Sequence, residues 1–264
     1  MRQLSIPGEF AVYETPPDQL EAVVRKLQQQ GVRGLSVTIP HKVAVMGLTT
    51  AIDETAKRVG AINTLVFEDS EIIGRNTDAL GFLRGLPEQR LASVAASRVL
   101  VLGGGGAARA VIMALVEQHA NSVTLCARNE AKSAEVLNIA KAARRHLESP
   151  TQLAWLPWHV LSDLSDYDWI VNATSLGMHP DENASPLSAA QIKTLPEAAL
   201  VYDLIYRPLQ TRLLADCAGR GLETCNGLAM LMHQGVAAFE LWSGECVPQT
   251  LCPALYETVR NALQ

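Results

Sequence analysis

Long apolar segments are the first thing that this sequence of 264 residues lacks. No apolar run approaches the length that a helix needs to cross a bilayer. The opening residues, MRQLSIPGEF, lack the apolar core of a signal peptide. We therefore expect no membrane partner and a location in the cytoplasm.

Paired cysteines and an excess of positive charge are also missing. The five cysteines are odd in number and form no C-x-x-C pair, which predicts unpaired thiols in a reducing compartment and no metal site. The formal net charge is -5 and the pI is about 5.7, so the chain has no general electrostatic attraction to nucleic acid. We expect no nucleic-acid partner, and a local basic cluster wherever an anion binds.

The remaining composition is that of a globular protein. Hydrophobic side chains make up 48% and charged ones 19% of a chain that is long enough for two domains or one large one. In the first part, helical patterns over residues 20–27 and 52–59, a β-prone run at 35–39 and strands near 61–73 predict a small α/β domain.

From Arg98 onward, short apolar strands alternate with helical segments. After the first strand, at 98–102, further strands fit residues 122–126, 153–155, 169–172 and 200–204. This alternation is typical of a parallel, doubly wound, Rossmann-like sheet. Two helices, over 228–243 and 250–263, are expected to close the chain.

A glycine loop follows the first of these strands. Gly103-x-Gly105-x-x-Ala108 matches the dinucleotide-binding fingerprint with alanine in third place. Glycine lets the backbone approach a pyrophosphate, and the helix that follows offers free N–H groups at its start. A tight strand–helix turn without a ligand is the alternative.

The segment after the second strand favours NADP over NAD. An NAD site usually places Asp or Glu there to accept from the ribose hydroxyls, whereas this segment reads CARNEAK from Cys126 to Lys132. Arg128 and Lys132 are positive where the acid is expected, and a guanidinium can pair with a 2′-phosphate. A solvated basic surface is the alternative for both.

Three polar segments of the N-terminal part carry candidate catalytic residues. They are VTIPHK ending at Lys42, GAINT containing Asn63, and GRNTD ending at Asp78. Reduction of a ketone needs a hydride donor and a proton donor for the nascent alkoxide, and a lysine beside an aspartate can supply the proton. Spacing alone favours a simpler interpretation, with Lys42 on the surface and Asp78 as the N-cap of the following helix.

Together these motifs resemble those of the shikimate dehydrogenase family. In the family's order they are LSVTIPHK, GAINT, NTD, GGGGAARA, NATSLGM, DLIYRP and NGLAMLMHQG, followed by Phe239, Trp242 and Gly244. The resemblance covers nearly the whole chain from about Tyr13. It implies the reversible reduction of 3-dehydroshikimate to shikimate with NADPH, so the expected partner is a small-molecule substrate. The sequence leaves open whether the chain is a monomer or a homodimer.

The resemblance also implies roles for single residues. Lys42 is expected to be the catalytic acid/base, paired with Asp78. The substrate is expected to be held by Thr38, Asn63, Asp78, Tyr206 and Gln234. The NADP site is expected to be lined by Glu54, Gly103, Gly104, Gly105, Gly106, Ala107, Ala127, Arg128, Asn129, Glu130, Ala131, Lys132, Thr174, Leu204 and Gly227. Gln234 in the core and Tyr206 as a packing aromatic are the alternatives for those two residues.

The chain is expected to divide into three parts. Residues 1–90 form a substrate-binding catalytic domain, residues 91–240 an NADP-binding Rossmann-like domain, and residues 241–264 a C-terminal helix that packs back toward the first domain. The boundary is expected near Pro87 to Ala96, a stretch of polar and small residues.

Four departures from the family pattern stand out. Ser36, Gly104 and Ala127 replace the usual Asn, Ala and Asn. Family members also begin with a strand and a His-Ser-x-Ser-Pro segment whose serines bind the substrate carboxylate, and Ser5 followed by Pro7 is a poor substitute for it. We expect about one strand–helix unit to be missing, roughly two to three dozen residues, which leaves an exposed sheet edge and an incomplete carboxylate site.

Two other functions remain open. A relative that acts on quinate or uses NAD fits the same motifs, although Arg128 argues against NAD. A protein that binds NADP without turnover is the alternative from another class, and the missing serine segment supports it. An in-frame His-Ser-x-Ser-Pro segment in the DNA upstream of Met1 would favour the enzyme.

Overall fold

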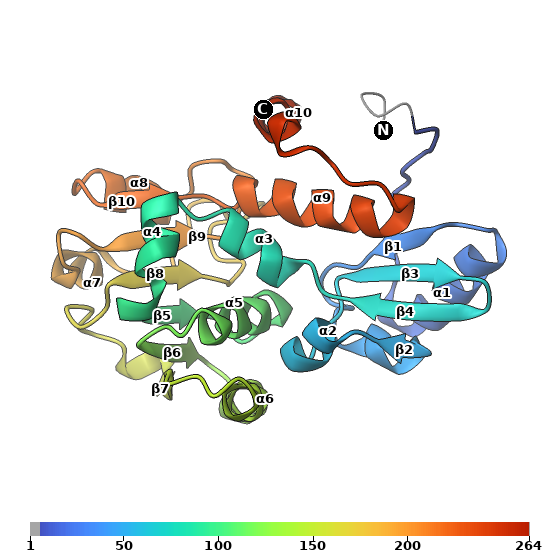
Figure 1. Ribbon diagram of the computed structural model, residues 1–264. Coiled ribbons are helices and arrows are strands. Elements are labelled where there is room, and N and C mark those ends of the chain that lie inside the picture. Colours follow the sequence, from blue (N-terminus) through green and yellow to red (C-terminus); the bar gives the residue numbers. More distant parts are fainter. Residues whose placement is uncertain (1–5, 264) are drawn as a thin grey trace.

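The computed structural model describes residues 6–263 and contains two β-sheets that stand side by side (Figure 1). Two helices at the junction, α3 (Asp78–Arg84) and α9 (Leu228–Ser243), pack closely against each other. One sheet is small and mixed and the other is parallel and doubly wound, which confirms the expected fold class. Ser5, considered above for the substrate carboxylate, lies outside the described residues.

The smaller sheet has four short strands in the order β1-β3-β4-β2. Their bounds are β1 Gly34–Ser36, β2 Ala51–Ile52, β3 Thr64–Glu68 and β4 Glu71–Arg75. The β1–β3 and β3–β4 pairs are antiparallel, whereas β2 runs parallel to β4. The amphipathic helix α1 (Leu20–Gln29) buries Leu20, Val24 and Leu27 in the core beside this sheet.

Two boundaries near the smaller sheet differ from the expected ones. The strand expected at 35–39 ends earlier, because the chain turns at Thr38, whose carbonyl accepts a hydrogen bond from His41 N. The helix expected from residue 52 is α2 (Glu54–Val59). It begins later because the Asp53 carboxylate accepts from Ala56 N at 2.6 Å and caps it.

The larger sheet has six parallel strands in the order β10-β9-β8-β5-β6-β7. Their bounds are β5 Arg98–Leu102, β6 Ser122–Ala127, β7 Gln152–Pro157, β8 Trp169–Asn172, β9 Leu200–Asp203 and β10 Glu223–Cys225. The chain first adds β6 and β7 on one side of β5 and then β8 to β10 on the other. The strand order therefore reverses between β5 and β8, and ligands of such sheets bind at this point, outside the carboxyl ends of the strands.

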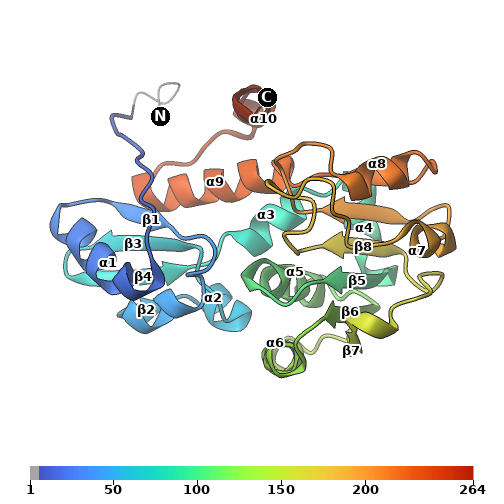
Figure 2. The ribbon, with the colours of Figure 1, turned by 180° about the vertical axis from the view of Figure 1, so that it is seen from behind.

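Helices cover both faces of the larger sheet. α5 (Gly106–Glu117) and α6 (Glu130–His146) share one core with Phe82 of α3. α7 (Ala189–Thr194) and α8 (Arg212–Ala218) share the core on the other face. Apolar runs such as RVLVL suit strands that are buried on both faces. Seen from behind, α2 of the smaller unit lies next to α5 and α6 (Figure 2).

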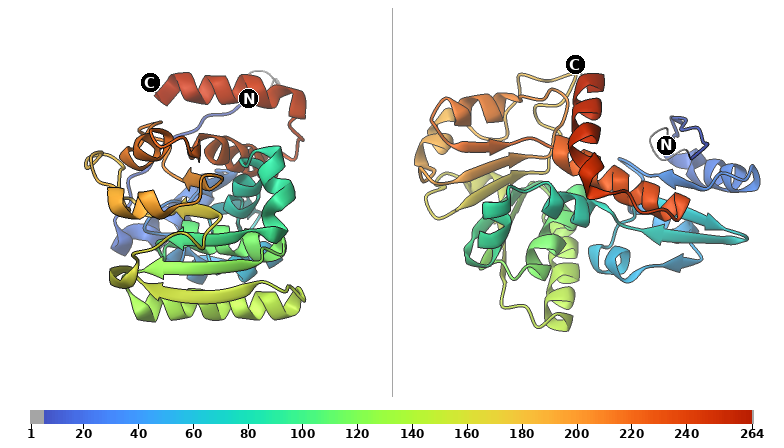
Figure 3. Two further views of the ribbon diagram at one scale, coloured as in Figure 1. Left: turned by 90° about the vertical axis from the view of Figure 1, so that its left-hand side faces the viewer. Right: turned by 45° about the horizontal axis from the view of Figure 1, so that its top comes forward.

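The stretch expected as a domain boundary is helical. α4 (Glu88–Ser93) and a short 3-10 helix (Val94–Ala96) follow Pro87, and Val94 is buried in the core of the larger sheet. The last helix, α10 (Cys252–Leu263), packs on α9 as an outer helix without any fully buried side chain (Figure 3). The division into residues 1–90, 91–240 and 241–264 stays a prediction.

Within residues 6–263, no helix is long and apolar enough to cross a membrane, and no three His, Cys, Asp or Glu side chains are placed to hold a metal ion. All five cysteines are unpaired, as expected. Burial raises the pKa of the Cys126 thiol to about 11 and that of the Cys217 thiol to about 12. Neither thiol therefore ionises near neutral pH.

Candidate active site

Three polar side chains from different segments of the smaller unit meet in one cluster. Lys42, in the turn region after β1, donates from Nζ to Asp78 Oδ2 at 2.5 Å. Asn63, just before β3, donates from Nδ2 to Asp78 Oδ1 at 2.9 Å. Asp78 is 4% exposed, so its charge acts in surroundings that contain little water. The buried carboxylate of Asp78 thus orients the ammonium group of Lys42. In this position the ammonium group can exchange a proton with the oxygen of a bound molecule.

Asn76 holds the start of α3 and thereby orients Asp78. Its Oδ1 accepts from the N–H groups of Asp78 and Ala79 at 3.0 and 3.3 Å. Its Nδ2 donates to Ala61 O at 2.9 Å. Asn76, one residue before the N-cap position Thr77, therefore satisfies the first two N–H groups of α3. The interpretation of Asp78 as the cap is wrong, since the Asp78 carboxylate accepts from Lys42 and Asn63 instead.

Lys42 also touches the larger unit, at the first residue of α5. A Cβ placed on Gly106 would lie 3.1 Å from Lys42 Cδ and 3.2 Å from Lys42 Cβ. The alkyl chain of Lys42 thus occupies the space that a side chain at position 106 would need. The candidate proton donor and the candidate dinucleotide loop are therefore neighbours, although they belong to different sheets.

The glycine loop has the shape and the free space that a phosphate group needs. Gly103 has a φ of +103°, and a Cβ there would lie 3.0 Å from Ala173 O and from Thr174 Cγ2. A Cβ on Gly105, the N-cap of α5, would have no atom within 4 Å. The first N–H groups of α5 have no intrahelical partner and can bind an anion in this space.

The basic segment after β6 lies beside this loop. A Cβ on Gly104 would be 3.7 Å from Ala127 Cβ, at the end of β6. Arg128 and Lys132 are exposed, and neither forms an ion pair in the part of the chain that the structure describes. Asn129 caps α6, since its Oδ1 accepts from Lys132 N at 2.9 Å. A guanidinium and an ammonium are thus available to an anion here.

The loops after β8 and β9 reach the same edge of the sheet. Thr174, after β8, donates from N and Oγ1 to Asn172 Oδ1 at 3.0 and 2.7 Å. Leu204 follows β9, and a Cβ on Gly227 would overlap its carbonyl oxygen. Only glycine therefore lets the start of α9 approach this loop so closely. Thr174, Leu204 and Gly227 lie at the carboxyl edge of the sheet, as the glycine loop does.

Among the remaining substrate candidates, Gln234 lies in the cluster itself. Its Oε1 accepts from Asn63 Nδ2 at 3.3 Å, so it faces the site and not the core. Thr38 is exposed in the turn before Lys42. Tyr206 is 40% exposed, so it is not a packing aromatic.

Within the described part of the chain, no hydrogen bond or ion pair ties the side chains of four cofactor candidates to the glycine loop. Glu54 opens α2 and pairs with Lys57 at 2.8 Å, which lowers the pKa of its carboxyl group. Glu130 and Ala131 are exposed in the first turn of α6, and Ala107 is half-buried in the first turn of α5. Their roles toward the cofactor stay predictions.

Six buried polar side chains near the site were not among the candidates from the sequence. They are Thr64, Asn76, Thr77, Asn172, Asp203 and Thr211. Asn172 and Asp203 end the neighbouring strands β8 and β9, and Asn172 Nδ2 donates to Asp203 Oδ1 at 3.0 Å. A polar residue at the end of an otherwise apolar strand is the signal that could have identified both.

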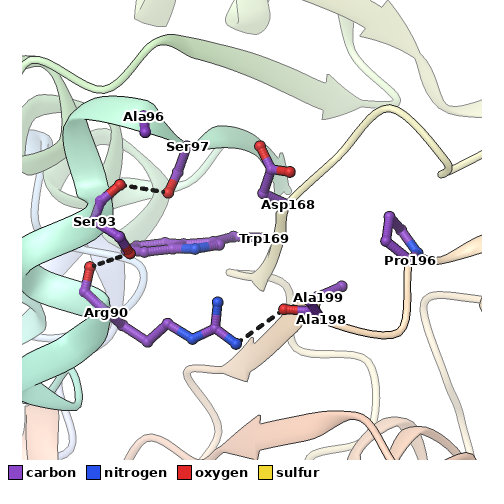
Figure 4. A pocket seen from close by; sticks show the side chains of 9 residues that line it. All are labelled: Arg90, Ser93, Ala96, Ser97, Asp168, Trp169, Pro196, Ala198 and Ala199. Atoms are coloured by element: carbon purple, nitrogen blue, oxygen red, sulfur yellow. Dashed lines mark hydrogen bonds between the residues drawn. The ribbon is translucent and has the colours of Figure 1, made fainter.

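A cavity of about 260 Å³ lies at the opposite, amino-terminal end of the larger sheet (Figure 4). Arg90 and Ser93 of α4 line it, together with Trp169 at the start of β8. Arg90 Nη2 donates to Ala198 O at 2.9 Å and to Glu223 Oε2 at 2.6 Å. The cation at this cavity is thus already paired, and the cavity does not belong to the cluster around Lys42.

Comparison with known proteins gives one consistent family. The model of the shikimate dehydrogenase substrate binding domain matches residues 1–65. The shikimate dehydrogenase (NADP(+)) of Geobacillus kaustophilus is 34% identical over 243 residues, which are 92% of this chain and 84% of that protein. These matches confirm the resemblance seen in the motifs.

Solved structures agree with the sequence relatives. The shikimate 5-dehydrogenase of Thermus thermophilus, in complex with NADP(H) and shikimate, superposes with a TM-score of 0.82 at 31% identity, over 99% of this chain and 91% of that one. The ligand-free 5-ketofructose reductase of a Gluconobacter strain superposes with a TM-score of 0.79 at 30% identity, over 95% and 86%. The same architecture thus occurs in a reductase named for a different substrate.

Proposed function

The chain belongs to the shikimate dehydrogenase family, and we propose that Lys42 and Asp78 transfer the proton in its reaction. The protein is an NADP-dependent oxidoreductase that reversibly reduces 3-dehydroshikimate to shikimate. One observation carries the assignment of the pair: Lys42 binds Asp78, and its alkyl chain occupies the space beside Gly106, where α5 begins after the glycine loop. A proton donor and a hydride donor must meet at one carbon–oxygen bond for a ketone to be reduced.

The proton transfer follows from the positions of three side chains. Addition of a hydride to the ketone carbon leaves negative charge on the oxygen, and Lys42 Nζ donates a proton to that oxygen. In the reverse direction, neutral Lys42 accepts the hydroxyl proton while the hydride leaves the adjacent C–H bond. Asp78 binds Nζ through Oδ2 and accepts from Asn63 at Oδ1, so neither carboxylate oxygen can easily turn away from its partner.

The residues around the glycine loop fit NADP, which supplies or accepts the hydride when bound. Gly103 to Ala107 suit the pyrophosphate, because the space beside Gly105 is open and α5 begins there. Arg128 and Lys132 suit the 2′-phosphate, because one follows β6, the other lies in the first turn of α6, and neither forms an ion pair within residues 6–263. Glu54, Thr174, Leu204 and Gly227 complete the proposed cofactor site.

The proposed substrate site combines the cluster with nearby polar groups. Thr38, Asn63, Tyr206 and Gln234 would hold the ring and its hydroxyls. Asn63 Nδ2 donates to Thr77 Oγ1 and Asp78 Oδ1 at 2.9 Å, and Gln234 Oε1 lies 3.3 Å from the same nitrogen. The substrate is a small molecule. Assembly as a monomer or homodimer, a cytoplasmic location and the lack of a nucleic-acid partner stay predictions.

The activity is tested directly with the purified chain. We expect NADP+ to be reduced in the presence of shikimate and not in its absence, with quinate as a second substrate to compare. A further arm uses NADPH with 5-ketofructose, because a reductase of that substrate has the same architecture. If NADP+ binds but is reduced with neither shikimate nor quinate, the proposed function is wrong.

Replacing Arg128 by alanine is expected to reduce the preference for NADP+ over NAD+ by about 10- to 100-fold. The reason is the loss of a charge-assisted contact, which is typically worth about 1.5–3 kcal/mol. The measurement is kcat/KM for each cofactor. Arg145→Ala, an exposed arginine near the far end of α6, is the matched control and should keep the preference. An unchanged ratio in Arg128→Ala would show that the selectivity resides elsewhere.

A further inference from the structure

The carboxylate of Asp203 is buried without a cation. Asp203 ends β9 and is 0% exposed, and no ion pair involves it within residues 6–263. Burial raises the pKa of its carboxyl group to about 6, against the lowering effect of the hydrogen bonds that it accepts. Burying such a charge is costly, which points to a role other than stability.

Asp203 joins three segments of the larger unit. Its Oδ1 accepts from Asn172 Nδ2 at 3.0 Å and from Ile205 N at 3.1 Å. Its Oδ2 accepts from Thr211 Oγ1 at 2.7 Å. These partners end β8, follow β9 and cap α8. One carboxylate therefore fixes the loops after two neighbouring strands to the start of a helix.

Asn172 extends this network to the dinucleotide loop. Its Oδ1 accepts from Thr174 N and Oγ1, and Thr174 Oγ1 accepts from Leu176 N at 3.1 Å. Thr174 in turn lies against Gly103, as the position of a Cβ on that glycine shows. Asp203 is thus linked through Asn172 to Thr174, the residue that lies beside Gly103 of the glycine loop.

We propose that Asp203 is a positioning residue whose ionised carboxylate sets the arrangement of Thr174, Leu204 and Tyr206 in the cofactor and substrate site. The inference rests on the proposed function, since these three residues are assigned to the site there. Ile205, whose N–H binds Asp203, lies between Leu204 and Tyr206. The carboxylate therefore controls the backbone between a cofactor residue and a substrate residue.

Protonation changes this network in a defined way. Asp203 Oδ2 must then donate, and Thr211 Oγ1 is the acceptor within reach, so Thr211 can no longer donate to it. The bonds from Asn172 and Ile205 then end on a neutral group, and hydrogen bonds to neutral groups are weaker. The loops after β8 and β9 are thereby held less firmly in weakly acidic solution.

The groups that face Asp203 do not supply another titration in this range. Asn172 of β8, Ile205 of the following loop and Thr211 at the start of α8 do not ionise. Cys217 of α8 interacts with the carboxylate, but burial raises its pKa to about 12. Among these groups, Asp203 itself is therefore the one expected to titrate near pH 6.

Asp203→Asn tests the inference, because asparagine mimics the protonated acid. Its amide oxygen can accept from Asn172 and Ile205, and its N–H can donate to Thr211. The measurement is the Kd of NADP+ by titration calorimetry without substrate, from about pH 5 to about pH 8. We expect the variant to bind about five- to tenfold more weakly than the unmodified chain at the higher pH. The two should bind alike at the lower pH. The 2′-phosphate of NADP titrates in the same range, and its effect cancels in the ratio of the two Kd values.

Two further variants isolate the cause. Asp216→Asn removes a carboxylate from the same helix, where it binds Arg212 instead, and its Kd ratio should stay near one at every pH. Thr211→Val removes the donor to Asp203 Oδ2 and also the side-chain cap of α8. Loss of the donor should raise the pKa of Asp203, so that NADP+ binding weakens at a higher pH than in the unmodified chain, whereas loss of the cap should act equally at every pH. Thr211→Val also keeps the inference testable if Asp203→Asn does not fold.

Thermal unfolding provides a readout that does not depend on the cofactor. The pKa of the Asp203 carboxyl group in the folded protein, about 6, lies above its ordinary value of 3.8. Protonation of Asp203 therefore stabilises the folded protein. This contribution is fully present below pH 3.8 and is lost as the pH rises through about 6. The unfolding temperature of Asp203→Asn relative to the unmodified chain should therefore rise with pH.

The outcomes separate this inference from the proposed function. A Kd ratio that grows with pH supports the role of Asp203, and a ratio that stays constant overturns it. A chain that binds NADP+ with this pH dependence but does not oxidise shikimate contradicts the proposed function alone.

Discussion

Replacing Lys42 by alanine is expected to lower kcat by about 100- to 10,000-fold, the usual effect of removing a positioned acid/base group. The affinity for NADP+ should stay close to that of the unmodified chain, because the glycine loop and Arg128 lie on the larger unit. The measurements are kcat for shikimate oxidation and the Kd of NADP+. Lys26→Ala, an exposed lysine on α1, is the control and should change neither. Near-normal turnover by Lys42→Ala would rule out the assignment.

The same pair should behave as one unit in a double mutant. Asp78 binds the lysine ammonium directly, so Asp78→Asn removes the group that orients Nζ. Lys42→Ala combined with Asp78→Asn should then lose little more than the worse of the two single variants. The measurement is the set of four kcat values. Losses that multiply would mean that Asp78 orients the substrate independently of the lysine.

Much of the fold could be predicted because it rests on local chemistry. The apolar strand at Arg98–Leu102, the glycines after it and the helix that follows are each specified within a few residues. The errors arose where a short-range contact changed a local preference. Asp53 delays the start of α2 by capping it, and the turn at Thr38 ends β1 before residue 39. Both contacts span only three residues, and an Asp just before a helix is a capping signal that the sequence itself contains.

The site was predictable in its residues but not in its contacts. Lys42, Asn63 and Asp78 were found through family motifs, and the structure joins all three by hydrogen bonds. The contact between Lys42 and Gly106 could not be foreseen, because it joins two sheets that are far apart in the sequence. Asp203 was passed over for a similar reason. Its partner Asn172 lies opposite it only because β8 and β9 pair in parallel.

The junction of α3 and α9 depends on glycines that let the two helices approach closely. A Cβ on Gly81 would lie 2.7 Å from Gln234 Cβ and 2.9 Å from Met230 O. A Cβ on Gly85 would lie 2.9 Å from Met230 N. α3 carries Asp78 at its start and α9 carries Gln234, so the spacing of the two helices determines how the amide of Gln234 meets Asn63.

Replacing Gly81 by alanine is therefore expected to destabilise the protein and to weaken substrate binding. Alanine favours a helix over glycine by about 1 kcal/mol, but the backbone oxygen of Met230 cannot move away without shifting α9. Overpacking of this kind typically costs about 1–3 kcal/mol. The shift should also draw Gln234 away from Asn63 and raise the KM for shikimate, with little change in the Kd of NADP+.

Gly235→Ala is the matched control, because it lies on α9 beside Gln234 and a Cβ there would meet no atom within 4 Å. It should keep the KM for shikimate and leave the protein as stable as before or up to about 1 kcal/mol more stable. The measurements are denaturant unfolding and steady-state kinetics on both variants. If Gly81→Ala matched Gly235→Ala in stability and in KM, the close approach of α3 and α9 would not be what positions Gln234. In that case α3 and α9 would move apart without displacing Gln234 from Asn63. The hydrogen bond from Asn63 to Gln234 argues against this.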